Sequence, residues 1–172
     1  MSAEPQVLIV LGSDSDIPAM SGCLEMLQRF GIRHELRICS AHSSPRAAHE
    51  LASGARDSGV QVVIAAAGGA AHLAGAMAAM TTLPVIGVPL VSSPLGGLDA
   101  LYATVQMPPG VPVATVSVGD WGARNAAVLA AQILSLSNPA LAEKLAAYKR
   151  ELHEQVEKKD RALRGLGAGG GA

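Results

Sequence analysis

The feature that most constrains the fold of this chain is a regular alternation between short strand-like runs and segments with helical periodicity. The predicted strands cover residues 6–12, 34–40, 60–69, 84–90 and 111–119. Helices are predicted at 16–31, 45–59 and 70–82, after a loop within 92–106, and at 123–136. Such alternation predicts an α/β fold: a three-layer, doubly wound (flavodoxin-like) parallel sheet with helices on both faces.

The pattern changes after residue 136. Asn138 and Pro139 form a favourable N-cap and first-turn pair, which predicts a long C-terminal helix over about 138–164. One face of this helix carries Leu141, Leu145, Tyr148 and Leu152. We expect that face to pack on a neighbouring subunit or across the chain's own sheet. The sequence thus predicts one domain over 1–164 and a flexible Gly/Ala tail over 165–172.

The composition argues against a membrane-spanning or nucleic-acid-binding protein. Hydrophobic residues make up 49% of the chain and charged residues 16%, and the mean hydropathy is +0.32. No apolar run reaches the roughly 18 residues of a membrane span, so we expect the apolar excess to be buried in a homo-oligomer. A net charge of -1 and 2% aromatic residues argue against nucleic-acid binding. The N-terminus lacks the features of a signal peptide, which predicts a cytoplasmic protein.

Polar and glycine-rich residues gather directly after four of the predicted strands. The segments are "LGSDSD", "CSAHSSP", "AAAGGAAH" and "GVPLVSSPLGG". In an open parallel sheet, ligands bind beyond the carboxyl ends of the strands. The sequence therefore predicts one ligand site formed by these loops.

The first loop, "GSDSD", suits a phosphorylated ribose. Ser13 and Ser15 could bind phosphate oxygens together with exposed backbone N–H groups, and Asp16 could accept from ribose hydroxyls. Ser and Asp are also favoured N-caps without any ligand, so simple helix capping remains an equal alternative.

Two histidines follow predicted strands. His42 lies in a polar loop, where an imidazole can both give and take a proton near neutral pH; the alternative is a surface histidine without a role. The glycines of "AAAGGAAHL" would let the backbone approach a flat ligand, or would simply allow tight strand–helix packing. We expect His72 one turn inside the following helix, where a structural role is more common.

The chain lacks the residues that other doubly wound proteins use for their chemistry. "LGSDSD" is not the G-x-G-x-x-G of a dehydrogenase. The third and fifth strands do not end in the aspartate and lysine of a phosphoacceptor domain. All four lysines lie at 144 or beyond, which argues against a Walker or Schiff-base lysine in the main body.

Six motifs together resemble those of the N5-carboxyaminoimidazole ribonucleotide mutases of purine biosynthesis. They are "GSDSD", "SAH..P", "AAAGGAAHL.G", "PVIGVP", "GLDAL" and "VQMPPGVPVATV", in order between about residues 7 and 136. The "GGAAHL" block favours the bacterial, class I mutases over the related aminoimidazole ribonucleotide carboxylases. The resemblance implies that a carboxylate moves from the exocyclic nitrogen to C4, giving 4-carboxy-5-aminoimidazole ribonucleotide, without metal or cofactor.

The resemblance also implies residue roles and partners. His42 matches the general acid/base of a decarboxylation and recarboxylation in which CO2 stays in the pocket. The implied substrate-binding residues are Ser13, Ser15, Asp16, Ser40, Ala41, Ser43, Gly68, Gly69, Ala70, His72 and Leu73. The family forms homo-octamers with sites at subunit interfaces, and an ATP-dependent carboxyaminoimidazole ribonucleotide synthase could hand over the substrate.

Three positions depart from the family pattern. Ser43 replaces a basic residue that usually helps to hold the phosphate, Ile17 replaces a common tryptophan, and Ala74 replaces a proline. We expect Arg46, in the turn after Pro45, to swing back and supply the missing charge; Arg124 is a second candidate. Two alternatives remain: a carboxylase that uses free CO2, and a nucleotide-binding paralogue with no activity or altered specificity.

Overall fold

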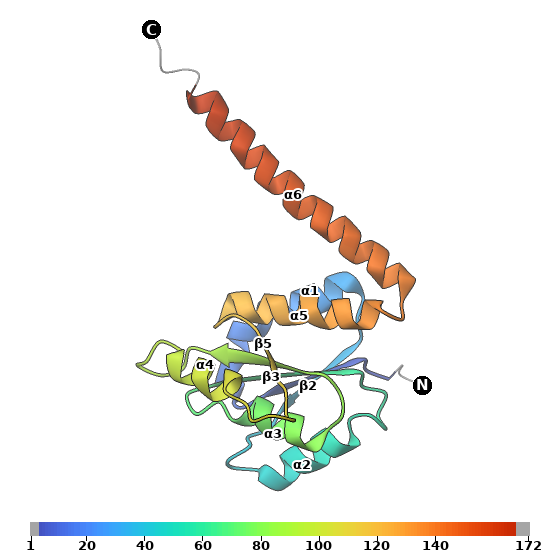
Figure 1. Ribbon diagram of the computed structural model, residues 1–172, viewed down its shortest axis with the longest axis vertical. Helices are drawn as coiled ribbons and strands as arrows, with labels where there is room; N and C mark the ends of the chain where they lie inside the picture. Colours follow the sequence, from blue (N-terminus) through green and yellow to red (C-terminus); the bar gives the residue numbers. More distant parts are fainter. Residues whose placement is uncertain (1–3, 168–172) are drawn as a thin grey trace.

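The computed structural model describes residues 4–167 and confirms the three-layer α/β fold (Figure 1). Its strands are Val7–Leu11 (β1), His34–Ile38 (β2), Val62–Gly68 (β3), Val85–Leu90 (β4) and Ala114–Thr115 (β5). They form one sheet in the order β2-β1-β3-β4-β5, and every pairing is parallel. This is the flavodoxin-like strand order, with its reversal point between β1 and β3.

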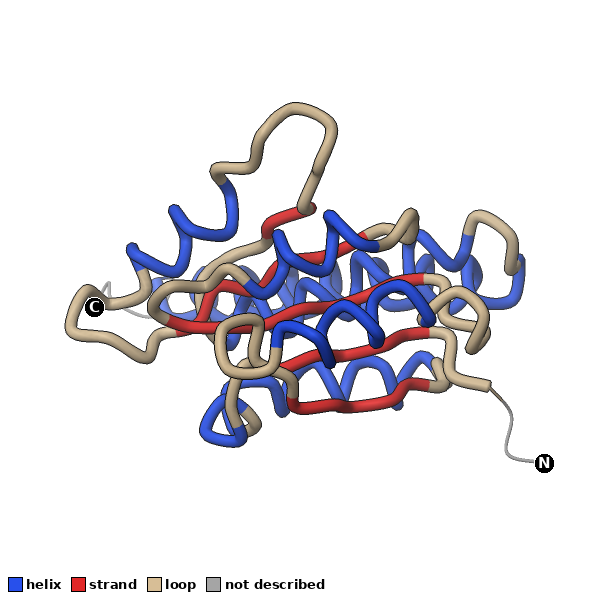
Figure 2. Tube along the Cα trace, turned by 90° about the horizontal axis from the view of Figure 1, so that it is seen from below, coloured by secondary structure: helices blue, strands red, loops and turns tan. Residues whose placement is uncertain are grey.

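Helices cover both faces of the sheet, as Figures 1 and 2 show. Helices α1 (Ser21–Phe30) and α5 (Asp120–Ser135) pack on one face. Helices α2 (Pro45–Gly54) and α3 (Leu73–Met80) pack on the other, and α4 (Leu98–Val105) lies beside β4 and β5. Among the described residues, no helix is both long and apolar enough to cross a membrane.

Strand β1 shows why the sheet forms the centre of the molecule. Its five residues are all buried, and their side chains alternate between two apolar clusters. Val7, Ile9 and Leu11 join the cluster under α1 and α5, whereas Leu8 and Val10 join the one under α2 and α3. A strand covered on both faces needs a continuous apolar run, which is the pattern of this segment.

Two elements are shorter than the sequence predicts. The helix expected from residue 16 begins only at Ser21, after 3-10 turns at Asp14–Asp16 and Pro18–Met20. Pro18 is the first residue of the second of these turns, a position that proline tolerates because the N–H there has no partner within the helix. The strand expected at 111–119 pairs only through Ala114–Thr115; Pro112 has no N–H to donate to the ladder.

Helix α6 (Pro139–Gly167) begins where predicted and packs on other helices, not across the sheet. Leu141 and Leu145 are buried in the cluster under α1 and α5. The Tyr148 ring meets Phe30 edge-on, with 5.7 Å between centroids. Beyond these turns the helix projects away from the body of the chain (Figure 1). Residues 165–167 continue α6 and are not a tail; the rest of the predicted tail, 168–172, lies outside the described residues.

Candidate functional site

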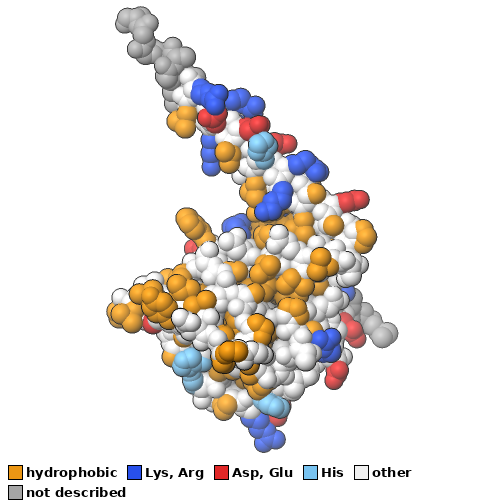
Figure 3. Space-filling model, viewed as in Figure 1, with side chains coloured by type: hydrophobic (Ala, Val, Ile, Leu, Met, Phe, Trp, Pro, Cys, Tyr) orange, Lys and Arg blue, Asp and Glu red, His pale blue; other side chains and the backbone are white. Residues whose placement is uncertain are grey.

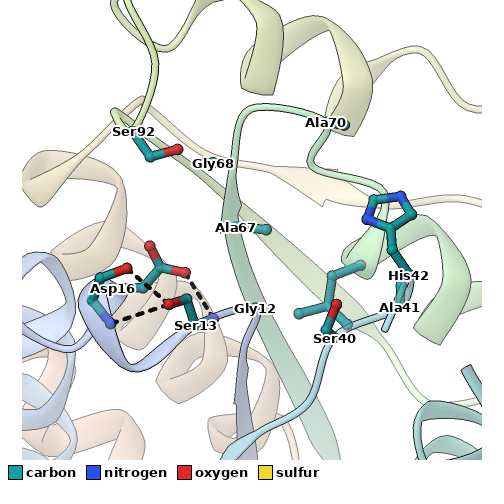
Figure 4. Close-up of a pocket in the computed structure, with 12 residues that line it drawn as sticks. Gly12, Ser13, Asp16, Ser40, Ala41, His42, Ala67, Gly68, Ala70 and Ser92 are labelled. Atoms are coloured by element: carbon teal, nitrogen blue, oxygen red, sulfur yellow. Dashed lines mark hydrogen bonds between the residues drawn. The ribbon is translucent and has the colours of Figure 1, made fainter. Parts of the chain in front are cut away.

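A pocket opens at the carboxyl edge of the sheet, at the reversal point between β1 and β3 (Figure 4). It encloses about 190 Å³. Its walls come from the loops that follow β1, β2, β3 and β4, so the four polar segments of the sequence meet here as predicted. The lining residues are Gly12, Ser13, Ser15, Asp16, Ser40, Ala41, His42, Ala67, Gly68, Ala70, Leu73 and Ser92.

The loop after β1 forms a capping box around its 3-10 turn. The Ser13 side chain accepts from the Ser15 N–H at 3.3 Å, and the Ser13 N–H donates to Asp16 Oδ2 at 3.1 Å (Figure 4). The Ser15 hydroxyl lies 2.8 Å from the Ser13 hydroxyl. The capping alternative is therefore correct as local structure. The same geometry turns hydroxyls and a carboxylate toward the pocket, so capping and ligand binding are compatible.

Asp16 is the one carboxylate in the pocket lining. Burial raises the pKa of its carboxyl group above the ordinary value of 3.8, the hydrogen bond from the Ser13 N–H opposes this rise, and the nearby Asp14 adds to it. Oδ2 is engaged by the backbone. The carboxylate has acceptor capacity beyond that bond, as binding a pair of hydroxyls requires.

The loop after β2 is a tightly hydrogen-bonded turn. The Ser44 hydroxyl donates to the Ser40 carbonyl at 2.9 Å and accepts from the Ser40 N–H at 3.2 Å. The Ser43 N–H donates to the Ser40 hydroxyl at 3.1 Å. The small hydroxyl residues of "SAHSSP" therefore fix the backbone on both sides of His42. The loop is built to hold that imidazole in one place.

The two histidines of the site meet directly. His42 Nε2 lies 2.8 Å from His72 Nδ1, and the rings meet edge-to-face with 5.0 Å between centroids. His72 is the N-cap residue of α3, which corrects the expectation that it lies one turn inside that helix. The helix starts late because the chain turns at Gly69, whose φ of 58° is a left-handed conformation that favours glycine.

Small residues form the wall opposite the first loop. A Cβ added at Gly68 would lie 1.9 Å from the Ser92 hydroxyl, so this position accepts only glycine at its present spacing. Ser92, two residues after the end of β4, faces the pocket (Figure 4). Sequence reasoning marked the segment "GVPLVSSPLGG" but did not select Ser92; its place directly after a strand was the available signal.

Nine of the predicted site residues line the pocket: Ser13, Ser15, Asp16, Ser40, Ala41, His42, Gly68, Ala70 and Leu73. Gly12, Ala67 and Ser92 were not predicted. His72 does not line this pocket but contacts His42, which does. His72 lines a neighbouring cavity with Tyr102 and Met107. Ser43 and Gly69 lie in the surrounding loops.

Arg46 is remote from the pocket in this conformation. Its guanidinium Nε lies 3.1 Å from Glu50 Oε1, one turn along α2, and its side chain is 93% exposed. Arg124, the second candidate, pairs with Glu25 at 3.4 Å. The pocket lining contains no Lys or Arg. Within the described part of the chain, no three His, Cys, Asp or Glu side chains gather as a metal site would need.

The sequence profile of one known family, described as AIR carboxylase, matches residues 6–155. The chain belongs to the AIR carboxylase family. Two members of this family are N5-carboxyaminoimidazole ribonucleotide mutases from Pyrococcus horikoshii and Thermotoga maritima. Each is 48% identical to this chain; the matches cover 96% and 95% of it, and 93% and 94% of the relatives. The suspected resemblance to these mutases is therefore confirmed.

A solved structure supports the same family assignment. The crystal structure of Treponema denticola PurE superposes on this chain with a TM-score of 0.83 at 28% identity, covering 92% of this chain and 98% of that one. The three positions that depart from the family pattern differ in burial. Ala74 is buried against the sheet, whereas Ile17 and Ser43 are exposed beside the pocket loops.

Proposed function

We propose that the pocket between β1 and β3 is where this chain converts N5-carboxyaminoimidazole ribonucleotide to 4-carboxy-5-aminoimidazole ribonucleotide, with His42 as general acid and base. The mutase activity follows from the chain's membership of the family and from its relatives. The observation that carries the role of His42 is its position: it is the one imidazole among the lining residues, and imidazole is the side chain that most often serves as general acid and base. Asp16, the other titratable lining group, is already bonded to the Ser13 N–H.

The proton balance of this reaction suits a single imidazole. Loss of CO2 from the exocyclic nitrogen leaves that nitrogen one proton short, and His42 donates it. Ring carbon C4 then attacks the CO2. His42 removes the hydrogen that C4 carried as a proton, and the ring becomes aromatic again. The proton given in the first step equals the one regained in the second, so no metal, cofactor or net proton is required.

The walls of the pocket suit a retained CO2. Ala67, Gly68, Ala70 and Leu73 present methyl groups, methylene groups or bare backbone to the interior. Small side chains leave room for a planar ring close to the backbone, and an apolar lining keeps water from competing for CO2. Gly69 and His72 complete this ring-side loop.

The other loops suit the ribose phosphate. Asp16 would accept from the ribose hydroxyls, and the hydroxyls and backbone N–H groups of Ser13, Ser15, Ser40 and Ser43 would surround phosphate oxygens. Ala41 adds backbone on the His42 side. Because the lining carries no cation, Arg46 would leave Glu50 and turn toward the phosphate. An exposed ion pair contributes only about 0–1 kcal/mol, so this exchange costs little. Arg46→Ala should raise KM, and an unchanged KM would refute the compensation.

The small pocket and the exposed apolar side chains support a homo-oligomer, for which we propose an octamer with sites at subunit interfaces. A volume of about 190 Å³ is below the roughly 300–1,000 Å³ of typical small-molecule sites. Exposed apolar side chains gather over α4 and the loop before it (Figure 3); they include Leu95, Leu98, Tyr102 and Val105. A neighbouring subunit would both cover this surface and close the site. The proposal includes a cytoplasmic location and substrate supply by the ATP-dependent synthase.

The deciding experiment supplies two substrates separately: N5-carboxyaminoimidazole ribonucleotide, and aminoimidazole ribonucleotide with CO2. Rapid conversion of the first alone supports the mutase. Conversion of the second alone would identify a carboxylase that uses free CO2. Binding without turnover of either would identify a nucleotide-binding paralogue, the outcome that the loss of the basic residue at Ser43 would explain.

A further inference from the structure

The hydroxyl of Ser92 differs from the other serine hydroxyls of the pocket in its hydrogen bonding. The pocket lining carries four serines, and three of them are engaged locally. The Ser13 side chain accepts from the Ser15 N–H, and the Ser15 hydroxyl lies 2.8 Å from that of Ser13. The Ser40 hydroxyl accepts from the Ser43 N–H. Ser92 makes no such bond within the part of the chain that the structure describes, so its O–H is available to donate to a ligand.

The position of this hydroxyl is fixed by its contact with Gly68. Gly68 does not have a left-handed conformation, so the backbone itself does not require glycine there. A Cβ at Gly68 would instead collide with the Ser92 side chain, which fills that space. Leu90 pairs with Gly68 in the sheet, and the Ser93 hydroxyl accepts from the Leu95 N–H at 3.1 Å in the following loop. Ser92 is therefore held between a strand end and a hydrogen-bonded turn.

The order of the strands places Ser92 and His42 on opposite sides of the pocket. His42 follows β2 and Ser92 follows β4, and β1 and β3 lie between these two strands. Figure 4 shows the same arrangement, with Gly68 between the two side chains. A planar ring that lies on Gly68 would therefore turn one edge toward His42 and the opposite edge toward Ser92.

The imidazole ring of the substrate carries different groups on its two edges. The ribose is bonded to N1, so C4, C5 and the exocyclic nitrogen form one edge, and C2 and N3 form the other. Rotation by half a turn about the bond between N1 and the ribose exchanges the two edges. The proposed reaction needs C4 and the exocyclic nitrogen beside His42. That orientation turns N3, which accepts hydrogen bonds, toward Ser92.

We propose that the Ser92 hydroxyl donates a hydrogen bond to N3 of the substrate ring and thereby selects the orientation in which C4 faces His42. This inference rests on the proposed function. The ionised Asp16 carboxylate cannot replace this contact, because it only accepts hydrogen bonds and N3 also needs a donor. The neighbouring wall residues Ala67 and Gly68 have no side-chain donor. Ser92 is thus the substrate contact that determines which edge of the ring reacts.

A change of one ligand atom tests this contact without turnover. Isothermal titration calorimetry compares the product nucleotide, 4-carboxy-5-aminoimidazole ribonucleotide, with an analogue in which a CH group replaces N3. Ser92→Ala removes the donor. Its matched control, Ser53→Ala, removes an exposed hydroxyl on α2 that donates to the His49 carbonyl of the same helix. The preference for the product over the analogue should fall by about 3- to 10-fold in Ser92→Ala, the worth of one neutral hydrogen bond, and stay at the wild-type value in Ser53→Ala.

Steady-state kinetics provides a second readout. Without the bond to N3, the ring can bind in both orientations, and only one of them reacts. Binding in the unreactive orientation lowers kcat and KM together, which offsets the rise in KM from the lost bond. The kcat of Ser92→Ala should therefore fall by about 3- to 10-fold with a smaller change in KM. Because Ser92 is exposed, the unfolding temperature should not change.

Three results would overturn the inference. The first is an equal preference for the product in the wild-type protein and both variants. The second is a Ser92→Ala variant that weakens both ligands equally, because the hydroxyl would then contact another group of the nucleotide. The third is a Ser92→Ala variant with wild-type kcat. Failure of the proposed function has a different signature: the wild-type protein would not bind the product nucleotide at all, and the inference would fall with it.

Discussion

The interior of the sheet and its carboxyl edge lie on the same strands, yet polar side chains occur at the edge and not in the two interior clusters. Strand β1 is buried throughout Val7–Leu11, and the next residues, Gly12 and Ser13, are already partly exposed and line the pocket. The interior consists of apolar side chains that stabilise the fold on both faces. The edge adds hydroxyls, one carboxylate, one imidazole and exposed backbone to a few small or apolar side chains such as Ala67 and Leu73. Residues that stabilise the fold and residues that line the pocket are therefore direct neighbours in the chain.

The largest effect should come from the edge. His42→Asn removes the proton carrier, and loss of general acid/base catalysis lowers kcat by about 100- to 10,000-fold. Because His42 is exposed, the unfolding temperature should stay unchanged. Steady-state kinetics and thermal unfolding measure the two quantities, and His49→Asn controls for the loss of an exposed histidine. Substantial residual activity would remove His42 from its proposed role.

The interior should give the opposite result. Leu8→Ala removes a fully buried side chain from the cluster under α2 and α3, which costs about 2–5 kcal/mol of unfolding free energy. The kcat of the molecules that remain folded should stay close to wild type. Urea unfolding checks the first value. Leu136→Ala deletes the same atoms from a side chain that is 89% exposed and should change the free energy far less. Equal losses in both variants would contradict the separation.

A third substitution tests the edge for binding. Asp16→Asn keeps the shape of the side chain but removes the charge that would accept from ribose hydroxyls. A hydrogen bond to a charged group contributes about 1.5–3 kcal/mol, so KM should rise by roughly tenfold or more while kcat changes less. Isothermal titration with the product nucleotide measures binding directly. A KM equal to wild type would leave Asp16 with its capping role alone.

The smallest effect, taken per pH unit, concerns pH and returns to the interior. Burial raises the pKa of the Cys23 thiol from 9.0 to about 12. The unfolded chain therefore loses this proton above pH 9 while the folded chain keeps it, so the unfolding free energy should fall as pH rises between 9 and about 12. The slope is at most about 1.4 kcal/mol per pH unit for one proton. Unfolding at several pH values measures it, and Cys23→Ala should flatten this part of the curve.

The elements of the fold were predictable because their signals are local. Continuous apolar runs identified most of the strands, alternation identified the strand after residue 33, and the Pro45 and Gly31 positions marked one helix start and one helix end correctly. The errors arose where a local rule was overridden. Two 3-10 turns stand where the first turn of α1 was predicted, and Pro112 shortened β5. The turn at Gly69 moved the start of α3 past His72. Each of these residues was visible in the sequence, but its consequence depended on backbone hydrogen bonds that periodicity does not report.

The sequence by itself determined that polar loops follow the strands and that His42 is the residue best suited to move a proton. It also carried enough motifs to identify the family. The flavodoxin-like fold predicted from the sequence already implied that β1 lies between β2 and β3, but only the tertiary structure showed that His42, Asp16 and Gly68 line one pocket. It alone placed His72 against His42 and Arg46 against Glu50. The physical reason is that side-chain contacts join residues far apart in the chain, whereas sequence patterns report the type and order of the elements and the burial of neighbouring residues.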